Sequence, residues 1–126
     1  MNKSTYVDGF VIVIPKKNTA KYKKMAREGL AAWKKFGALD YKECIADDMK
    51  MNTGGGSGFS FPKMVKLKPG ETIWFSFITY KSRKHRDAVN KKVMAYFDKK
   101  YKNTPMDMPF DMKRFTTGGF KVEIGM

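Results

Sequence analysis

Two segments of the chain alternate so that apolar side chains point to both faces of an extended strand. In residues 72–80, TIWFSFITY, one face carries Ile73, Phe75 and Phe77, and the other carries Trp74, Ile78 and Tyr80. Residues 6–14, YVDGFVIVI, have the same two-sided pattern. Because both faces of such a strand are covered in a folded protein, the pattern predicts two central strands of a sheet.

Two further segments have the mixed polarity of edge strands. Residues 38–47 combine the apolar Tyr41 and Ile45 with polar neighbours, and residues 115–124 alternate apolar and polar side chains. Charges on an edge strand discourage pairing with other chains. The sequence therefore predicts a sheet of four strands with these two at its edges.

Two helices are predicted between the strands. Residues 18–36 begin at a capping residue, Asn18, and residues 83–97 follow a second one, Ser82. The first helix has an apolar stripe at helical spacing: Tyr22, Met25, Ala26, Gly29, Trp33 and Phe36. Gly29 in this stripe either leaves room for a ligand or lets the helix approach the sheet closely, and we favour the close approach.

The remaining segments are predicted to be irregular. Residues 50–60 are rich in glycine but fit no phosphate-binding motif, so a mobile loop or lid is favoured over a phosphate cradle. Residues 61–67, FPKMVKL, are expected to be extended. Residues 99–114 contain two prolines and alternating Met and Asp, which predicts an extended, irregular connector.

The order β-α-β-β-α-β is the signature of an α+β, ferredoxin-like sandwich. We expect residues 1–126 to form one such domain, a four-stranded antiparallel sheet with two helices on one face. The helix-free face would then expose a large apolar surface, which monomers rarely tolerate. The sequence therefore predicts a homodimer through that face, a dimeric α/β-barrel.

Four stretches carry a resemblance over nearly the whole chain: YVDGFVIVIPK, GALDYKEC, FPKMVKLKPGETIWFSFITYKSRKHRDAVNKKVM and MDMPFDMKRFTTGGF. They resemble the YbaA-like family of uncharacterised bacterial proteins. The resemblance implies a dimeric α/β-barrel of ferredoxin-like fold. It implies no established activity, substrate or cofactor. The chain departs from the family pattern mainly at GGGSGFSF.

The composition is strongly basic, with 26 Lys and Arg against 12 Asp and Glu and a net charge of +14. Such a charge suits a polyanion partner such as RNA or DNA, or it belongs to a solvated lysine surface. Only four of the basic residues are arginines, the residue type that reads phosphates and bases, so the second interpretation is favoured. The single cysteine, Cys44, predicts a reduced, cytoplasmic setting, and no membrane span is expected.

Candidate catalytic chemistry rests on a few polar residues. His85 is the only histidine, and it either serves as a general acid or base or packs at a helix start. Asp107 and Asp111, with Arg114 close behind, form either an acid/base group or turn residues joined by an ion pair. Asp8 lies inside an apolar strand and needs a partner, for which Arg114 or Lys121 is expected. No metal-ligand spacing is present, and no metal or cofactor is expected.

Two functional hypotheses follow, from different classes. The first is a small-molecule pocket between sheet and helices, lined by Trp33, Trp74 and Phe77, with His85, Asp107, Asp111 and Arg114 around it. Whether such a site would be enzymatic stays open. The second, less favoured, is nucleic-acid or polyanion binding by the lysine-rich surface. A structural dimer module with no chemistry is the third alternative.

Overall fold

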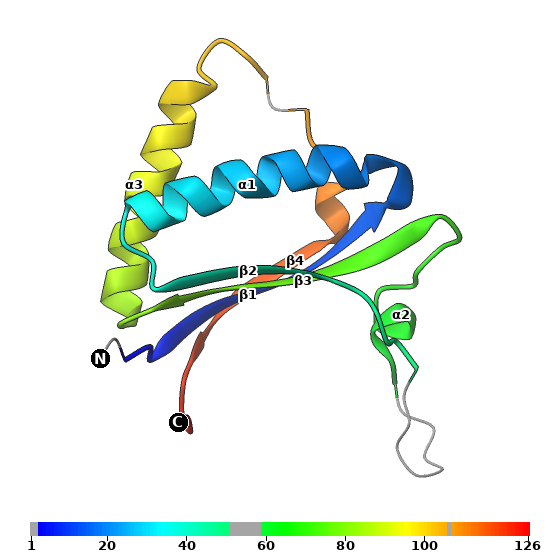
Figure 1. Cartoon of the computed structure of the whole chain (residues 1–126), viewed down its shortest axis with the longest axis horizontal. Coiled ribbons are helices and arrows are strands. Elements are labelled where there is room, and N and C mark those ends of the chain that lie inside the picture. The colour runs from blue at the N-terminus through cyan, green and yellow to red at the C-terminus, as the bar shows by residue number, and fades with distance from the viewer. Residues whose placement is uncertain (1–2, 51–58, 106) are drawn as a thin grey trace.

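The computed structural model describes residues 3–50, 59–105 and 107–126. Its elements follow the predicted order, with one short helix and two 3-10 turns added: β1 (Tyr6–Pro15), η1 (Lys16–Asn18), α1 (Thr19–Lys35), β2 (Asp40–Ile45), α2 (Phe61–Met64), β3 (Glu71–Tyr80), α3 (Arg83–Lys100), η2 (Met112–Arg114) and β4 (Phe115–Lys121). Figure 1 shows α1 and α3 above one face of the sheet and α2 below it.

The four strands form one antiparallel sheet in the order β2-β3-β1-β4. The prediction that the two strands apolar on both faces lie at the centre is confirmed. The register pairs Val11 of β1 with Phe75 of β3 and Ile12 with Trp74, so paired residues share a face of the sheet. The α+β, ferredoxin-like arrangement predicted from the sequence is therefore the one observed.

The helix-covered face holds the buried core, which has two clusters. One gathers around Tyr80, Val89 and Val93 where α3 packs on the sheet. The other contains Tyr22 and Trp74 between α1 and the sheet.

The opposite face of the sheet, called the helix-free face because neither α1 nor α3 lies on it, is apolar and only partly covered by the short helix α2. Phe61 of α2 lines the same groove as Ile73 and Val11, so α2 shields one end of this face. Phe75 and Phe120 remain 45% and 62% exposed. The part of this face that α2 does not cover is therefore an exposed apolar surface.

Several local predictions need correction. Residues 61–64 are helical, not extended, because Ser60 Oγ accepts a hydrogen bond from the Lys63 N–H and a proline suits the first turn. Asn18 precedes α1 but does not cap it with its side chain, which donates instead to the Pro109 carbonyl oxygen at 2.8 Å. Ser82 caps α3 as predicted, accepting from the His85 N–H at 3.1 Å.

The partner predicted for Asp8 is also wrong. Asp8 is buried on the helix-covered face, so its neighbours come from α3 and not from β4. Arg86 Nη1 lies 3.5 Å from its carboxylate, and Asn90 donates to it at 3.4 Å. Most of the glycine-rich loop, residues 51–58, lies outside the described residues, so its predicted mobility stays a prediction.

Candidate functional site

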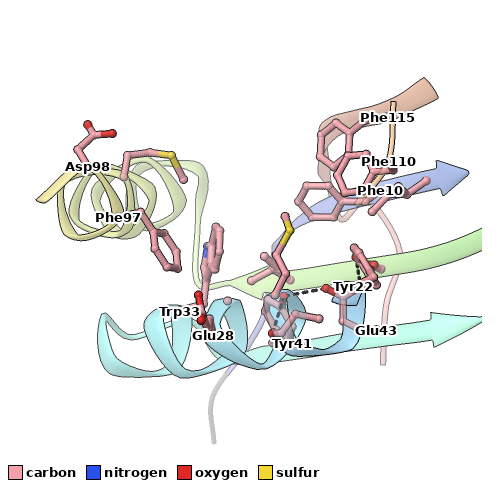
Figure 2. Close-up of a pocket in the computed structure, with 17 residues that line it drawn as sticks. Phe10, Tyr22, Glu28, Trp33, Tyr41, Glu43, Phe97, Asp98, Phe110 and Phe115 are labelled. Atoms are coloured by element: carbon pink, nitrogen blue, oxygen red, sulfur yellow. Dashed lines mark hydrogen bonds between the residues drawn. The ribbon is translucent and has the colours of Figure 1, made fainter. Parts of the chain in front are cut away.

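A cavity of about 300 Å³ lies between the sheet and the two long helices. Figure 2 shows that its walls come from α1, α3, the strands and the connector before β4. Seven aromatic side chains line it: Phe10, Tyr22, Trp33, Tyr41, Phe97, Phe110 and Phe115. A cavity with apolar walls and a few polar groups is the usual form of a small-molecule site.

One carboxylate in this cavity, that of Glu43, accepts three hydroxyl hydrogen bonds. Tyr22 Oη donates to Oε1 and Tyr41 Oη donates to Oε2, each at 2.7 Å, as the dashed lines in Figure 2 show. Ser76 Oγ also donates to Oε1. These four side chains form a polar corner of the cavity, built from β2, β3 and α1.

The backbone register explains why these groups meet. Glu43 of β2 pairs with Ser76 of β3, so the two side chains stand next to each other on the helix-covered face. Tyr41 lies two residues before Glu43 and shares its face, because side chains alternate along a strand. Tyr22 reaches the same carboxylate from the first turn of α1.

Burial and the Glu43 charge hold both tyrosines in their neutral form. Desolvation is the larger cause and raises the pKa of Tyr22 and of Tyr41 far above the ordinary value, and the neighbouring carboxylate raises both further. At neutral pH the two phenols are therefore fixed hydrogen-bond donors to Glu43. They are poor candidates for a general base.

Two more carboxylates line the cavity, those of Glu28 and Asp98. Glu28 is held by the Tyr101 hydroxyl, and Lys100 Nζ lies 3.8 Å from it. Asp98 is exposed on α3. None of the described residues that line the cavity is a lysine or an arginine, although the chain carries a charge of +14.

At Gly29, α1 packs closely against the Tyr41 side chain of this polar corner. A Cβ atom added there would lie 2.7 Å from Tyr41 Oη. The prediction that this glycine permits close approach of helix and sheet is confirmed. Gly29 also belongs to the cavity wall, so the close approach and the cavity occur at one place.

Of the three predicted ligand-binding aromatics, the cavity includes one. Trp33 lines it, and its indole N–H donates to Asn90 Oδ1 at 3.0 Å and to Tyr80 Oη at 3.1 Å. Trp74 lies outside the lining and packs against Tyr22 with ring centroids 4.9 Å apart. Phe77 pairs with Gly9 on the helix-free face.

The four predicted catalytic residues are not brought together. His85 Nδ1 accepts a hydrogen bond from the Lys81 N–H at 3.0 Å, at the start of α3. Asp107 is exposed and pairs with Lys21, and Asp111 caps the η2 turn by accepting from the Lys113 N–H.

Arg114, the fourth, is held elsewhere. It pairs with Glu71 and donates to the carbonyl oxygens of Val65 and Lys66, so it ties β4 to the segment before β3. None of the four lines the cavity. Their catalytic roles stay predictions, without a shared site among the described residues.

Sequence reasoning missed the polar corner itself. Its signal was present in the spacing of Tyr41 and Glu43, which share one face of an edge strand. Ser76 was a second signal, as a hydroxyl within an otherwise apolar central strand. Because register between the strands cannot be read from either segment alone, their meeting was not predictable.

The described residues include neither a cluster of metal-ligand side chains nor a membrane-spanning helix. They contain no group of three or more His, Cys, Asp or Glu side chains placed to hold a metal ion. No helix among them is long and apolar enough to cross a membrane.

The architecture places the chain in the class of ferredoxin-like α+β proteins. A solved structure with this fold, described as a dimeric ferredoxin-like protein from an uncultured marine organism, matches with a TM-score of 0.53 at 15% identity. The match covers 97% of this chain and 99% of the other. At this identity the likeness concerns the fold.

The chain belongs to the family described as "Protein of unknown function (DUF1428)", which matches residues 5–112. It is 40% identical over 116 residues to the "Uncharacterized protein YbaA" of Escherichia coli (strain K12), covering 92% of this chain and 94% of the relative. The protein of the same name from Shigella flexneri gives the same values. The YbaA-like resemblance is therefore confirmed, and with it a family without an assigned function.

Proposed function

We propose that this protein binds a small organic molecule in the cavity between the sheet and helices α1 and α3. The observation that carries the proposal is the combination of aromatic walls with the polar corner at Glu43, where three hydroxyl groups hold one carboxylate. Such a combination gives an apolar molecule burial and one orienting contact. Trp33, predicted from the sequence as a ligand-binding residue, belongs to this proposed site.

Native mass spectrometry of protein purified from its own host tests the proposal. We expect a co-purified small molecule on the wild type. Ala26 lines the cavity, so the Ala26→Leu variant should lose that molecule by filling its space. Ala31 lies exposed on the same helix, so Ala31→Leu is a matched control that should retain it.

The outcome that contradicts the proposal is equally concrete. If the wild type carries nothing, and a library of small aromatic probes leaves the indole N–H signal of Trp33 unmoved, the cavity is not a binding site. Trp74 supplies an internal reference in the same spectrum, because it lies outside the cavity lining.

We also propose that two copies associate through the helix-free face. Support comes from the exposed apolar side chains there, with Phe75 at 45% and Phe120 at 62%, and from the dimeric ferredoxin-like protein that shares the fold. A face that packs on its own copy around a two-fold axis covers both surfaces at once.

A charge placed on that face tests the association. Phe75→Glu should convert a dimer to a monomer in sedimentation velocity, because a carboxylate would be buried in an apolar interface. Leu30→Glu is the matched control, since Leu30 is 43% exposed on α1, on the other side of the sheet. A wild-type monomer, or a dimer that survives Phe75→Glu, would refute the arrangement.

A second candidate function is polyanion binding by the exposed face of α1. The observation in its favour is a set of basic side chains that are all exposed on this helix: Lys21, Lys23, Lys24, Arg27, Lys34 and Lys35. Binding of RNA or DNA through them should be strongest at about 50 mM salt and fall steeply above it. Absence of binding at that salt concentration would remove this candidate.

We also propose a cytoplasmic location, which the single cysteine favours. Fractionation of host cells checks it.

A further inference from the structure

Four of the chain's twelve Asp and Glu side chains are buried or half-buried: those of Asp8, Glu28, Glu43 and Glu71. Three of these have a basic partner, because Asp8 pairs with Arg86, Glu28 with Lys100 and Glu71 with Arg114. Glu43 is the exception. Among the described residues its partners are three neutral hydroxyl groups and no lysine or arginine.

A carboxylate without a counter-charge is costly in an apolar surrounding. Hydroxyl hydrogen bonds offset part of that cost but leave the net charge in place. An ionised carboxylate has about four acceptor positions, of which the hydroxyls of Tyr22, Tyr41 and Ser76 use three. Glu43 therefore keeps both a net charge and one acceptor position for a further donor.

The walls of the cavity favour the same sign of ligand charge. The faces of aromatic rings attract cations, and Trp33, Tyr41 and Phe97 all lie on the cavity wall. The other charged side chains in the described lining, Glu28 and Asp98, are acidic as well. An anionic molecule attracted to the basic surface would meet only like charges inside.

We propose that the molecule bound in the cavity is a primary amine with an aromatic or apolar body, whose ammonium group pairs with Glu43. This inference rests on the proposed small-molecule site and adds the chemical class of its ligand. The ammonium supplies the missing counter-charge and donates to the remaining acceptor position of Glu43. The body of the amine fills the space between the aromatic walls, and the cavity volume of about 300 Å³ keeps it small.

Three probes of similar size and different charge test this assignment on the wild-type protein. They are 2-phenylethylamine, 2-phenylethanol and 3-phenylpropionate, titrated against the isotope-labelled protein and followed at the Trp33 indole signal. We expect the amine to bind at least about tenfold more tightly than the alcohol, the size of one charge-assisted hydrogen bond. The carboxylate should bind most weakly of the three.

A matched pair of variants locates the charge that is responsible. Glu43→Gln should remove the preference for the amine over the alcohol while the alcohol still binds. Glu71→Gln makes the same chemical change at a carboxylate outside the cavity and should keep the preference. If Glu43→Gln does not fold, the ratio of the three affinities on the wild type still tests whether the cavity prefers an amine.

The two proposals fail in different ways. Equal binding of the three probes, or tighter binding of the alcohol or the carboxylate, overturns the amine assignment and leaves the small-molecule site standing. A preference for the amine that Glu43→Gln retains overturns the role of Glu43. If no probe of any charge shifts the Trp33 signal, the small-molecule site fails and the amine assignment fails with it.

Discussion

The carboxylate of Asp8, near the start of the central strand β1, lies 3.5 Å from the guanidinium of Arg86 on α3. Both side chains are shielded from solvent, Asp8 almost completely. Arg86 also donates to Tyr6 Oη at 3.1 Å, and its guanidinium carbon lies 5.0 Å from the Tyr6 ring centroid. Burial by itself lowers the pKa of Arg86, but Asp8, Tyr6 and Asp87 together outweigh this effect and raise it. This pair joins β1 to α3 across the core.

Removal of one partner from this pair should destabilise the fold strongly. Arg86→Met leaves the Asp8 charge buried without a cation, which costs about 3 kcal/mol or more in the free energy of unfolding. Urea denaturation measures the change. Arg83→Met is the control, because Arg83 lies exposed one turn away and its pairing with Asp87 spans 4.0 Å, so its loss should cost under about 1 kcal/mol.

A second substitution distinguishes charge from packing. Asp8→Asn in the Arg86→Met background removes the unpaired charge and should recover most of the lost stability. If the double variant is no more stable than Arg86→Met alone, the arginine acts through its packing on Tyr6 and not through the ion pair.

The fold was predictable because its signals are local, whereas the partners in its core were not. Two-sided strands such as residues 72–80 and the cap at Ser82 report directly on sheet position and helix start. The partner of Asp8 depends on which face of the sheet its side chain points to. On that face lies α3, and the partner is Arg86, 78 residues further along the chain. The predicted partners, Arg114 and Lys121, are wrong because the cation that pairs with Asp8 comes from the covering helix and not from a neighbouring strand.

The candidate site was less predictable, for a related reason. The predicted catalytic set rests on residue type alone, and its members make structural contacts at separate places, as Arg114 does with Glu71 and Asp107 with Lys21. The polar corner at Glu43 depends on the register between β2 and β3 and on the depth at which α1 sits. Neither quantity is encoded in a short window of sequence. Two predictions agree with the observed cavity: its place between the sheet and the helices, and Trp33 in the apolar stripe of α1 as one of its lining residues.

The close contact between Gly29 and Tyr41 makes an unusual prediction for Gly29→Ala. Alanine favours a helix over glycine by about 1 kcal/mol, but its Cβ would lie 2.7 Å from Tyr41 Oη. The hydroxyl would have to leave Glu43, and a hydrogen bond to a charged acceptor contributes about 1.5–3 kcal/mol. We therefore expect Gly29→Ala to lower the free energy of unfolding by about 1 kcal/mol.

The sign of this effect should reverse when the hydroxyl is absent. In a Tyr41→Phe background the nearest remaining atom of that ring is 3.6 Å from the added Cβ, an ordinary contact. Gly29→Ala should then stabilise the protein by about 1 kcal/mol through helix propensity alone. A double-mutant cycle in urea measures both values, and equal effects in the two backgrounds would contradict the contact.

The buried tyrosines predict a loss of stability at alkaline pH. Burial, and the nearby charges of Glu43 and Asp8, raise the pKa of Tyr22, Tyr41 and Tyr80 in the folded protein above their value of about 10 in an unfolded chain. A raised pKa means that the folded state holds these protons more tightly. The stabilisation is therefore complete below about pH 10 and decreases as the pH rises above it.

A spectrophotometric titration of tyrosinate checks this. In the folded protein these three residues should not ionise near pH 10, whereas in denaturant all six tyrosines should. The Tyr22→Phe variant should give the same absorbance change as the wild type while folded and one tyrosinate fewer when unfolded. A smaller change in the folded variant would show that Tyr22 titrates in the native state.

Substitution of His85 distinguishes a structural role of this residue at the start of α3 from a catalytic one. Its Nδ1 accepts the Lys81 N–H at 3.0 Å, and its ring meets the Tyr80 ring edge-on with centroids 5.9 Å apart. His85→Ala should therefore cost about 1 kcal/mol and lower the melting temperature by a few degrees. His85→Asn should cost less, since an amide oxygen can accept the same N–H. Because His85 does not line the cavity, the 2-phenylethylamine titration should be the same for both variants as for the wild type. Loss of binding in His85→Ala with an unchanged melting temperature would instead support the acid/base role predicted from the sequence.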